Sequence, residues 1–459
     1  MSTLKVNKIR DNSGSTDAIV LDPSGGAVLA GVTTVSAVKV GSGVTISSDG
    51  DVFTTGITTS SSVIVGSGVT ITESGIEASG IGITVANINS GAVSGPRNLI
   101  INGAMNVTQY QDKIGDNTND GYAVDRMRTE VNSVDNDVTS SSGTVASGTT
   151  PYSLGFRKTW KVVNGNQTSG AQGTSRIAFQ YRIEAQDIAH SGWDYTSPTS
   201  FITLQFWCKS SVAQNFYGLL MSNDGTQQNY PFETGSLTAD TWTKVVKTIP
   251  GNANLTFNED SGEGIKIEIH MLRGTDYTDS SVSLNQWAAY ATGTRTPDQT
   301  TTWFTTNDAT FEVTGLQLEV GSQATSFEHR LFADELAQCQ RYFVMFGGNV
   351  TAWRLGFMWV NTSTNAYCDV HLPVTMRNIP SQIYTNGTAA EYQVHGASSA
   401  SSGGNQIVNS SSLPTIHTQS TKNLVQLSFT TAGSLVVGRN AWFRSNASTV
   451  YIGIGAEIA

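Results

Sequence analysis

The chain carries little charge, and most of that charge is acidic. Charged residues make up 14% of its 459 residues, against about 25% in typical soluble proteins. The 26 basic and 36 acidic side chains leave a formal net charge of -10, which is opposite in sign to the charge that binds nucleic-acid phosphates. We therefore expect no nucleic acid among its partners.

Cysteine is scarce as well. The three cysteines, Cys208, Cys339 and Cys368, are odd in number and far apart in the sequence. They indicate neither a disulfide framework nor a zinc cluster. The six histidines show no metal-ligand spacing. We predict three reduced, buried thiols, no metal site and no cofactor.

Long apolar runs are missing. No stretch approaches the roughly 18 uncharged apolar residues of a membrane span, and Met1 to Arg10 lacks the apolar segment of a signal peptide. We expect synthesis in a cytoplasm and no insertion into a membrane.

Familiar catalytic motifs are absent too. The sequence contains no Gly-x-Ser-x-Gly, His-Glu-x-x-His or Gly-x4-Gly-Lys motif. Cleavage of a glycan would need two carboxylates about 5 to 9.5 Å apart. Acidic side chains are usually solvated, so we predict no catalytic residues and no enzyme activity, with a polysaccharide depolymerase as an alternative. The acidic residues that lie close together in the middle of the chain are Glu233, Asp240, Glu259, Asp260, Glu263 and Glu268.

Glycine, serine, threonine and asparagine dominate the polar residues, a composition typical of β-strands and turns. Apolar residues alternate with polar ones at a period of two from Asn98 onward, which predicts half-buried antiparallel strands in a jelly-roll sandwich over 98–330. A parity shift at Gly315 predicts a β-bulge. The inward residues would be Ile177, Phe179, Tyr181 and Ile183, then Ile202, Leu204, Phe206 and Cys208, then Ile265, Ile267, Ile269 and Met271.

The pattern changes after Phe327. Apolar residues at helical spacing predict a short linking helix over 331–344. Alternation at a period of two then resumes, which predicts a smaller distal β-domain over 345–459. The helical stripe is Phe332, Leu336, Cys339 and Phe343, and the distal alternation includes Trp353, Leu355, Phe357 and Trp359, then Val425, Leu427 and Phe429, then Val450, Ile452 and Ile454.

The first 97 residues hold an internal repeat and one aromatic residue, Phe53. The segment Val40-Gly-Ser-Gly-Val-Thr-Ile-Ser47 recurs 25 residues later (65 minus 40) as Val65-Gly-Ser-Gly-Val-Thr-Ile-Thr72. Repeated short strands bury their apolar residues by stacking. Because small side chains alone supply too little core, we predict an intertwined β shaft shared by identical chains, with threefold symmetry as a simple closed solution. The alternative is a disordered Gly/Ser linker.

Three stretches resemble the tail fibre proteins of tailed bacteriophages. They are Arg97-Asn-Leu-Ile-Ile-Asn-Gly-Ala-Met-Asn-Val107, Phe311-Glu-Val-Thr-Gly-Leu-Gln-Leu-Glu-Val-Gly-Ser-Gln-Ala-Thr-Ser-Phe-Glu328 and Glu335-Leu-Ala-Gln-Cys-Gln-Arg-Tyr-Phe343. The 25-residue repeat and the opening Ser2-Thr-Leu-Lys-Val-Asn-Lys-Ile9 resemble fibres of phages that infect marine cyanobacteria.

The resemblance implies a homotrimeric, all-β fibre located in the virion. Its N-terminus would bind the phage tail or another virion protein, and its distal part a host surface glycan or an outer-membrane receptor. A capsid-attached decorating fibre is an alternative. The expected parts are an attachment segment over 1–30, a shaft over 31–97, the sandwich over 98–330, the helix over 331–344 and the distal domain over 345–459.

Glycan binding favours aromatic rings beside amides and carboxylates in loops, because the rings stack on the apolar faces of sugars. For each such ring, packing in the core is the alternative. His371, on a predicted strand, could meet its own copies across a threefold axis and share an ion. The predicted ligand-binding residues are Trp193, Tyr195, Trp287 and Tyr290 in the sandwich, and Tyr384, Tyr392, His395 and Trp442 in the distal domain.

Overall fold

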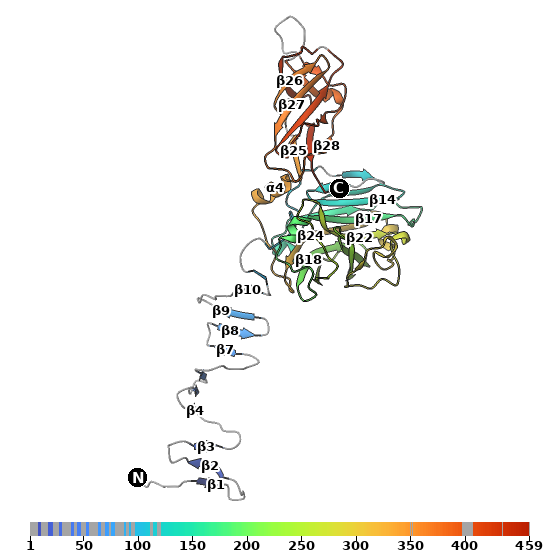
Figure 1. The fold of residues 1–459 in the computed structure, drawn as a ribbon. Helices are drawn as coiled ribbons and strands as arrows, with labels where there is room; N and C mark the ends of the chain where they lie inside the picture. The colour runs from blue at the N-terminus through green and yellow to red at the C-terminus, as the bar shows by residue number, and fades with distance from the viewer. Residues whose placement is uncertain are drawn as a thin grey trace. The chain divides into compact units, whose positions relative to one another are not determined.

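The computed structural model describes residues 97–110, 121–348, 350, 352–396, 407–433 and 435–458. It also describes the backbone of short strands in the first 92 residues and of one strand at Lys113–Asp116 (Figure 1). Two compact units divide the chain, Met1–Val85 and Ala86–Ala459. The regular structure is nearly all β, which confirms the predicted fold class.

The described strands of the first unit form three small antiparallel sheets, each of three consecutive strands. Two of these sheets repeat with the 25-residue spacing seen in the sequence: strands that begin at Val38 and Val44 recur at Val63 and Val69. The repeat is therefore a strand-forming unit. The strands are β1 (Lys8–Arg10), β2 (Asp17–Leu21), β3 (Ala27–Leu29), β4 (Val38–Val40), β5 (Val44–Ile46), β6 (Val52–Thr54), β7 (Val63–Val65), β8 (Val69–Thr72) and β9 (Gly75–Ala78).

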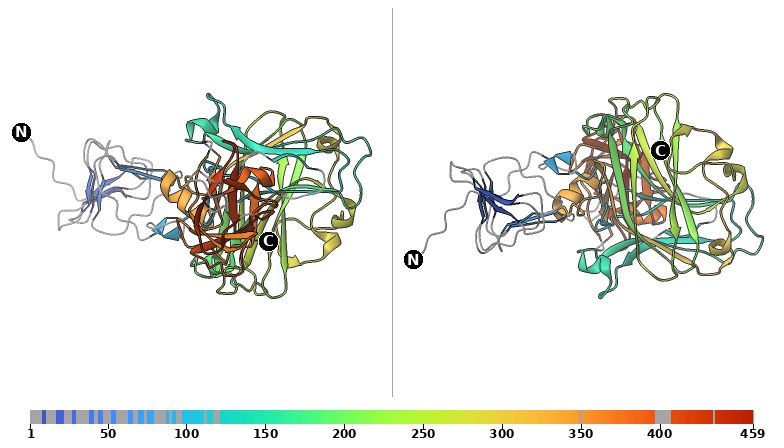
Figure 2. Two further views of the ribbon diagram at one scale, coloured as in Figure 1. Left: turned by 90° about the horizontal axis from the view of Figure 1, so that it is seen from above. Right: turned by 90° about the horizontal axis from the view of Figure 1, so that it is seen from below.

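The second unit begins with a small hairpin and then forms a sandwich of two antiparallel sheets (Figure 2). The chain crosses repeatedly from one sheet to the other, as in a jelly roll. The hairpin is β10 (Asn87–Ile88) and β11 (Gly91–Ala92). The six-stranded sheet has the order β12 (Lys113–Asp116), β15 (Val138–Thr144), β16 (Lys158–Val163), β24 (Thr310–Val320), β18 (Phe201–Ser210) and β21 (Thr243–Pro250). The seven-stranded sheet has the order β13 (Gly121–Val124), β14 (Met127–Asn132), β17 (Arg176–Glu184), β22 (Glu263–Arg273), β19 (Asn215–Ser222), β20 (Gln228–Ser236) and β23 (Ala288–Ala289).

The core of the sandwich lies between the two sheets, and it confirms the predicted alternation. The inward residues predicted on β17, β18 and β22 are all buried. The predicted bulge is confirmed as well, because the pairing of β18 with β24 shifts register between Gln205 and Trp207, opposite Gly315. The three cysteines are free and buried, and burial raises the pKa of the Cys208 and Cys368 thiols to about 12. These thiols are structural rather than reactive.

Short helices connect the strands. The predicted helix after Phe327 is α4, and it is shorter than expected. It ends at Gln340, and Phe343 begins the next strand instead of completing a helical stripe. Phe332 is 60% exposed, whereas Cys339 is buried. The helices are α1 (Thr150–Ser153), α2 (Ala185–Ala189), α3 (Thr302–Thr305) and α4 (Phe332–Gln340), with 3-10 turns η1 (Thr275–Tyr277), η2 (Thr292–Thr294) and η3 (Ala389–Glu391).

A second β-domain follows α4, with a core of its own between two further antiparallel sheets. The predicted inward residues of its strands over 424–430 and 451–455 are buried. The three-stranded sheet has the order β25 (Phe343–Gly347), β34 (Tyr451–Gly455) and β28 (Gln382–Thr385). The seven-stranded sheet has the order β30 (Ile407–Asn409), β29 (Tyr392–His395), β33 (Asn440–Ser445), β26 (Phe357–Thr362), β27 (Asn365–His371), β32 (Leu424–Thr430) and β31 (Thr415–Ile416).

The three stretches that resemble tail fibre proteins lie together in the structure. The backbone N–H of Leu99 donates to the carbonyl of Leu318 over 2.9 Å, and the Asn98 side chain accepts from the N–H of Leu318 over 3.0 Å. The Glu335 carboxylate, on α4, accepts from the N–H of Asn102 over 2.5 Å. The resemblance therefore rests on one packed structural unit that joins the start of the sandwich to its last strand and to α4.

Buried charges join the distal domain to the sandwich. Arg126, in the turn between β13 and β14, pairs with Glu457, and both side chains are almost fully buried. The Arg126 guanidinium also lies 3.5 Å from the centre of the Tyr342 ring. Arg341 pairs with Glu184 at 2.8 Å, and the Tyr342 hydroxyl donates to the same carboxylate over 2.5 Å. Because a buried charge is costly without its partner, these pairs hold the two domains in one arrangement.

We expect the substitution Glu457→Gln to destabilise the protein by about 3 to 5 kcal/mol, because it leaves the Arg126 charge buried without its partner. The matched control is Glu259→Gln, whose carboxylate is 80% exposed and whose loss should change stability by at most about 0.5 kcal/mol. The measurement is urea unfolding of the full chain, followed by tryptophan fluorescence. Equal stability of the two variants would show that the ion pair does not join the domains.

Candidate functional site

Strand β26 presents large aromatic rings to the outside of the distal domain. Met358 and Val360 point into the core, whereas Phe357 is 84% exposed and Trp359 is 44% exposed. The sequence analysis grouped Phe357 and Trp359 with Trp353 and Leu355 as one apolar face, but the structure reverses the face at this strand. Both faces of β26 are apolar, and the smaller aliphatic side chains are the ones that fit between the sheets.

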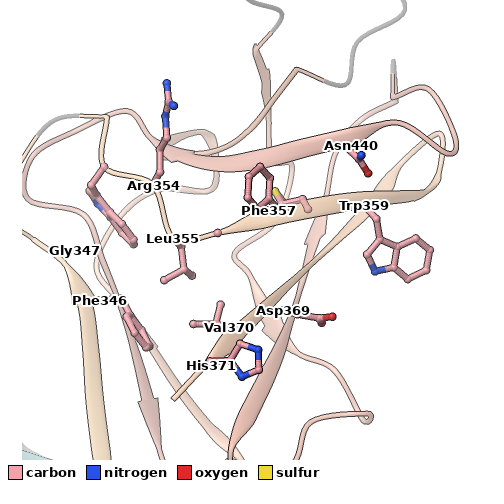
Figure 3. A pocket seen from close by; sticks show the side chains of 13 residues that line it. Phe346, Gly347, Arg354, Leu355, Phe357, Trp359, Asp369, Val370, His371 and Asn440 are labelled. Carbon is pink, nitrogen blue, oxygen red and sulfur yellow. The ribbon is translucent and has the colours of Figure 1, made fainter. Parts of the chain in front are cut away.

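The exposed rings border a cavity of about 670 Å³. One end is formed by Phe346, and Leu355, Val370 and His371 lie between it and Trp359 at the other end (Figure 3). The Trp353 ring packs against Gly347, where a β-carbon would approach the ring to 2.2 Å, and its Nε1 donates to the carbonyl of Val450 over 2.9 Å. The remaining lining residues are Arg354, Gly356, Phe357, Met358, Asp369 and Asn440.

Several polar groups at this cavity are available to a ligand. His371 and Asn440 are exposed, and their side chains make no hydrogen bond with another described residue. Asp369 accepts one hydrogen bond, from the Gln426 amide over 2.7 Å. Arg354 is exposed, and its guanidinium lies 5.1 Å from the centre of the Trp442 ring. Small-molecule sites usually combine an apolar lining with a few polar groups that orient the ligand.

The cavity continues into a strip of rings on the outer face of the seven-stranded sheet. Trp359 lies 5.1 Å from Tyr367 on the neighbouring strand, and Tyr367 lies 4.8 Å from His417. On the other side of β26, Phe357 is paired in register with Trp442 on β33. We call these five residues the aromatic strip. Cross-strand neighbours on one face of a sheet stand side by side, so the strip extends across several strands.

Among the residues that line the cavity, Asp369 is the only carboxylate. Retaining and inverting glycosidases use two carboxyl groups on either side of the scissile bond. The acidic residues named in the sequence analysis lie elsewhere. Of these, Glu268 is buried beside Arg273 and Lys266. Burial alone would raise the pKa of Glu268, but these two cations hold it well below its usual value.

Among the described residues, no three His, Cys, Asp or Glu side chains come together as metal ligands. His371 is among the residues that line the cavity. In the same part of the chain, no helix is long and apolar enough to cross a membrane.

The four aromatic residues predicted as ligand-binding in the sandwich mainly pack against its core. Trp193 is buried, and Tyr195 packs edge-on to Phe257 at 4.9 Å. Trp287 is half-buried, and its Nε1 donates to the carbonyl of Pro250 over 2.7 Å. Tyr290 is half-buried, and its ring centre lies 5.2 Å from the Arg295 guanidinium. Trp193 therefore has no face open to a sugar.

The four predicted residues of the distal domain lie in different environments. Tyr392 is fully buried, and its hydroxyl donates to the carbonyl of Tyr451 over 3.0 Å. Tyr384 packs edge-on against Phe343 at 5.4 Å, at the junction with the sandwich. His395 is buried and contacts the half-buried Trp442 at 4.6 Å. Only Trp442 belongs to the aromatic strip.

Phe357 and Trp359 are not among the ligand-binding residues that the sequence predicted. The available signal was that Phe357, Met358, Trp359 and Val360 are all apolar, so that one of the two faces had to remain outside the core or be covered by another element. Alternation by itself does not say which face is buried.

No family model and no curated protein matches the sequence. Among solved structures, the chain is similar to the enzymatically active domain of tailspike protein 4 of bacteriophage CBA120, at 11% identity and a TM-score of 0.26, over 49% of this chain and 21% of that one. It is similar to the family 11 carbohydrate-binding module of Clostridium thermocellum, at 12% identity and a TM-score of 0.21, over 48% and 98% of the two chains. A tandem CBM22 domain of Paenibacillus barcinonensis Xyn10C matches at 7% identity and a TM-score of 0.24, over 80% and 100%. At these scores the similarities identify neither a family nor a ligand for this chain.

The two faces of β26 predict opposite responses to truncation. We expect Met358→Ala to cost about 2 to 5 kcal/mol of stability, because it opens a cavity in the distal core. Trp359→Ala should cost at most about 0.5 kcal/mol, because its ring lies outside that core. Thermal unfolding of the two full-length variants measures the difference. A larger loss for Trp359→Ala would place its ring in the packing of the domain rather than at a binding surface.

Proposed function

We propose that this chain is a virion fibre protein of the phage tail fibre type that attaches the particle to its host by binding a surface glycan at the cavity of the distal domain. The observation that carries the proposal is the pair of exposed rings, Phe357 and Trp359, at the edge of a cavity with available polar groups. Removing a side chain such as Phe357 from water contributes about 1.5 to 3 kcal/mol of free energy. The distal domain does not cover this ring, so a bound ligand can supply that burial.

The chemistry of the cavity suits a sugar. Aromatic faces pack against the apolar face of a pyranose ring, and Asp369, His371 and Asn440 can bond its hydroxyls. The polar groups include one carboxylate and one guanidinium, Arg354, so the cavity has no strong preference for a charged ligand. The aromatic strip extends the contact surface to further units of the same glycan.

The sequence supports the fibre part of the proposal. The three stretches that resemble tail fibre proteins enclose most of the sandwich, and the repeat ahead of them suits a shaft shared by identical chains. In a homotrimer, three weak glycan sites on one fibre would act together, because binding at one site raises the effective concentration at the others. The N-terminal segment would hold the fibre on the virion.

The cavity is tested by competition for adsorption. We expect the full chain, added in excess, to block phage adsorption to cyanobacterial host cells. The double variant Phe357→Ala/Trp359→Ala should block at least about tenfold less well, since truncation of an anchoring aromatic costs about 2 kcal/mol or more. The matched control is Phe332→Ala, an exposed phenylalanine on α4 away from the cavity. Full competition by the double variant would exclude this cavity as the receptor site.

The trimer is tested separately by the mass of the full chain in solution. We expect three times the 48.8 kDa of one chain by sedimentation or light scattering, and a monomer would contradict the shared shaft. The double variant Phe357→Ala/Trp359→Ala should keep the trimer mass. If it dissociates instead, the two rings contact a second copy of the chain and not a glycan.

A further inference from the structure

The sandwich carries a cavity of its own, on the outer face of its six-stranded sheet. It has a volume of about 420 Å³. Trp207 on β18 and Lys244 on β21 stand side by side there, because the two residues are paired in register. The other lining residues are Leu154, Phe156, Gln205, Gly315, Ala324, Thr325, Ser326, Phe327 and His329.

The β-bulge between β18 and β24 shapes this cavity. Trp207 pairs with Thr314, and Gln205 pairs with Gln317. Gly315 and Leu316 of β24 therefore lie together opposite the single residue Phe206 of β18. Gly315 has φ +65°, and a β-carbon at this position would lie 2.7 Å from the Phe156 ring. Bulges redirect the side chains beside them. Here the missing side chain of Gly315 lets the Phe156 ring pack directly against the bulge, at the floor of the cavity.

The wall of the cavity opposite the sheet is held rigidly. Glu319 accepts from the backbone N–H of Thr325 over 2.8 Å and from its hydroxyl over 2.6 Å. The Gln205 amide donates to the carbonyl of Thr325 over 2.8 Å, and the N–H of Glu328 donates to the Gln317 side chain over 2.8 Å. A binding surface that is ordered before the ligand arrives loses less entropy on binding.

Aromatic and apolar groups cover most of the surface of this cavity. Phe327 is half-buried and packs against Phe156 at 4.9 Å and against His329 at 4.8 Å. Trp207 is half-buried, and Leu154 is 50% exposed. These groups offer flat faces on which a sugar ring can stack.

The charge of this cavity is opposite to that of the protein. The whole chain carries 36 acidic and 26 basic residues, yet the lining includes the ammonium of Lys244 and no carboxylate. Lys244 is exposed, and its side chain makes no ion pair with another described residue. His329 lies with its Nε2 at 2.9 Å from the carbonyl of Leu154, a contact in which Nε2 donates, so that Nδ1 is left for a ligand.

We propose that this cavity is a second saccharide site, selective for a sugar that bears a carboxylate. The sugar ring stacks on Trp207, and its carboxylate pairs with the ammonium of the adjacent Lys244. The residues involved are distinct from those of the distal cavity, so binding here does not depend on the function proposed for the distal domain.

Calorimetric titration of the full chain tests the site with two probes, a short oligogalacturonate and a neutral oligogalactose of equal length. We expect the oligogalacturonate to bind more tightly, and less so at high salt because salt screens charge pairs. Lys244→Met should weaken oligogalacturonate binding about tenfold and leave the neutral probe unchanged, since a charge-assisted hydrogen bond is lost. The control is Lys247→Met, a half-buried lysine on the other face of the same strand and outside the cavity, and it should bind like the wild type.

Two further variants locate the binding. Trp207→Leu should weaken both probes, and Phe357→Ala/Trp359→Ala should leave oligogalacturonate binding unchanged. Loss of oligogalacturonate binding in the second variant would assign the binding to the distal cavity and overturn the proposal. The same holds if the wild type binds no oligogalacturonate, or if Lys244→Met binds it as well as the wild type does.

Discussion

Each strand of this protein has two faces, and only one of them can join a core between two sheets. The period of two that separates the faces governs the rest of the structure. The sandwich and the distal domain each bury the inward residues of their facing sheets, and the outward residues form the outer surfaces of those sheets. The cavity beside Trp207 lies on the outer side of the six-stranded sheet, and the distal cavity is bordered by outward residues of β26 and β27. At β26 the inward positions belong to Met358 and Val360, and for that reason Phe357 and Trp359 lie outside the core.

The distal cavity also depends on how its domain is held. Its wall includes Phe346 on β25, which pairs with β34. The chain then leaves β34 and reaches Glu457, which is paired with Arg126 of the sandwich. The Arg126–Glu457 pair and the cavity wall are therefore connected through the paired strands β25 and β34. Fixing such a wall before a ligand arrives reduces the entropy lost on binding.

The resemblance to tail fibre proteins and the distal cavity concern different residues. The matching stretches pack together through Asn98, Leu318 and Glu335, and they serve to close the sandwich and position α4. Five matching residues, Gly315, Ala324, Thr325, Ser326 and Phe327, also line the cavity beside Trp207, while the aromatic strip lies outside all three stretches. A shared scaffold with separate binding surfaces is a common arrangement, because a fold does not by itself decide what its surface binds.

The sequence by itself determined the strands of the sandwich, the buried side of β17, β18 and β22, the bulge at Gly315 and the burial of the three cysteines. These features follow from local periodicity and composition, which act between neighbours in the chain. The tertiary structure alone decided which aromatic residues face solvent: Trp193 and Tyr392 entered cores, whereas Phe357 and Trp359 remained outside. It alone paired Arg126 with Glu457, and it brought Phe346, Asp369 and Asn440 to one cavity. Alternation reveals which residues share a face, but which face is covered depends on elements that are distant in the sequence.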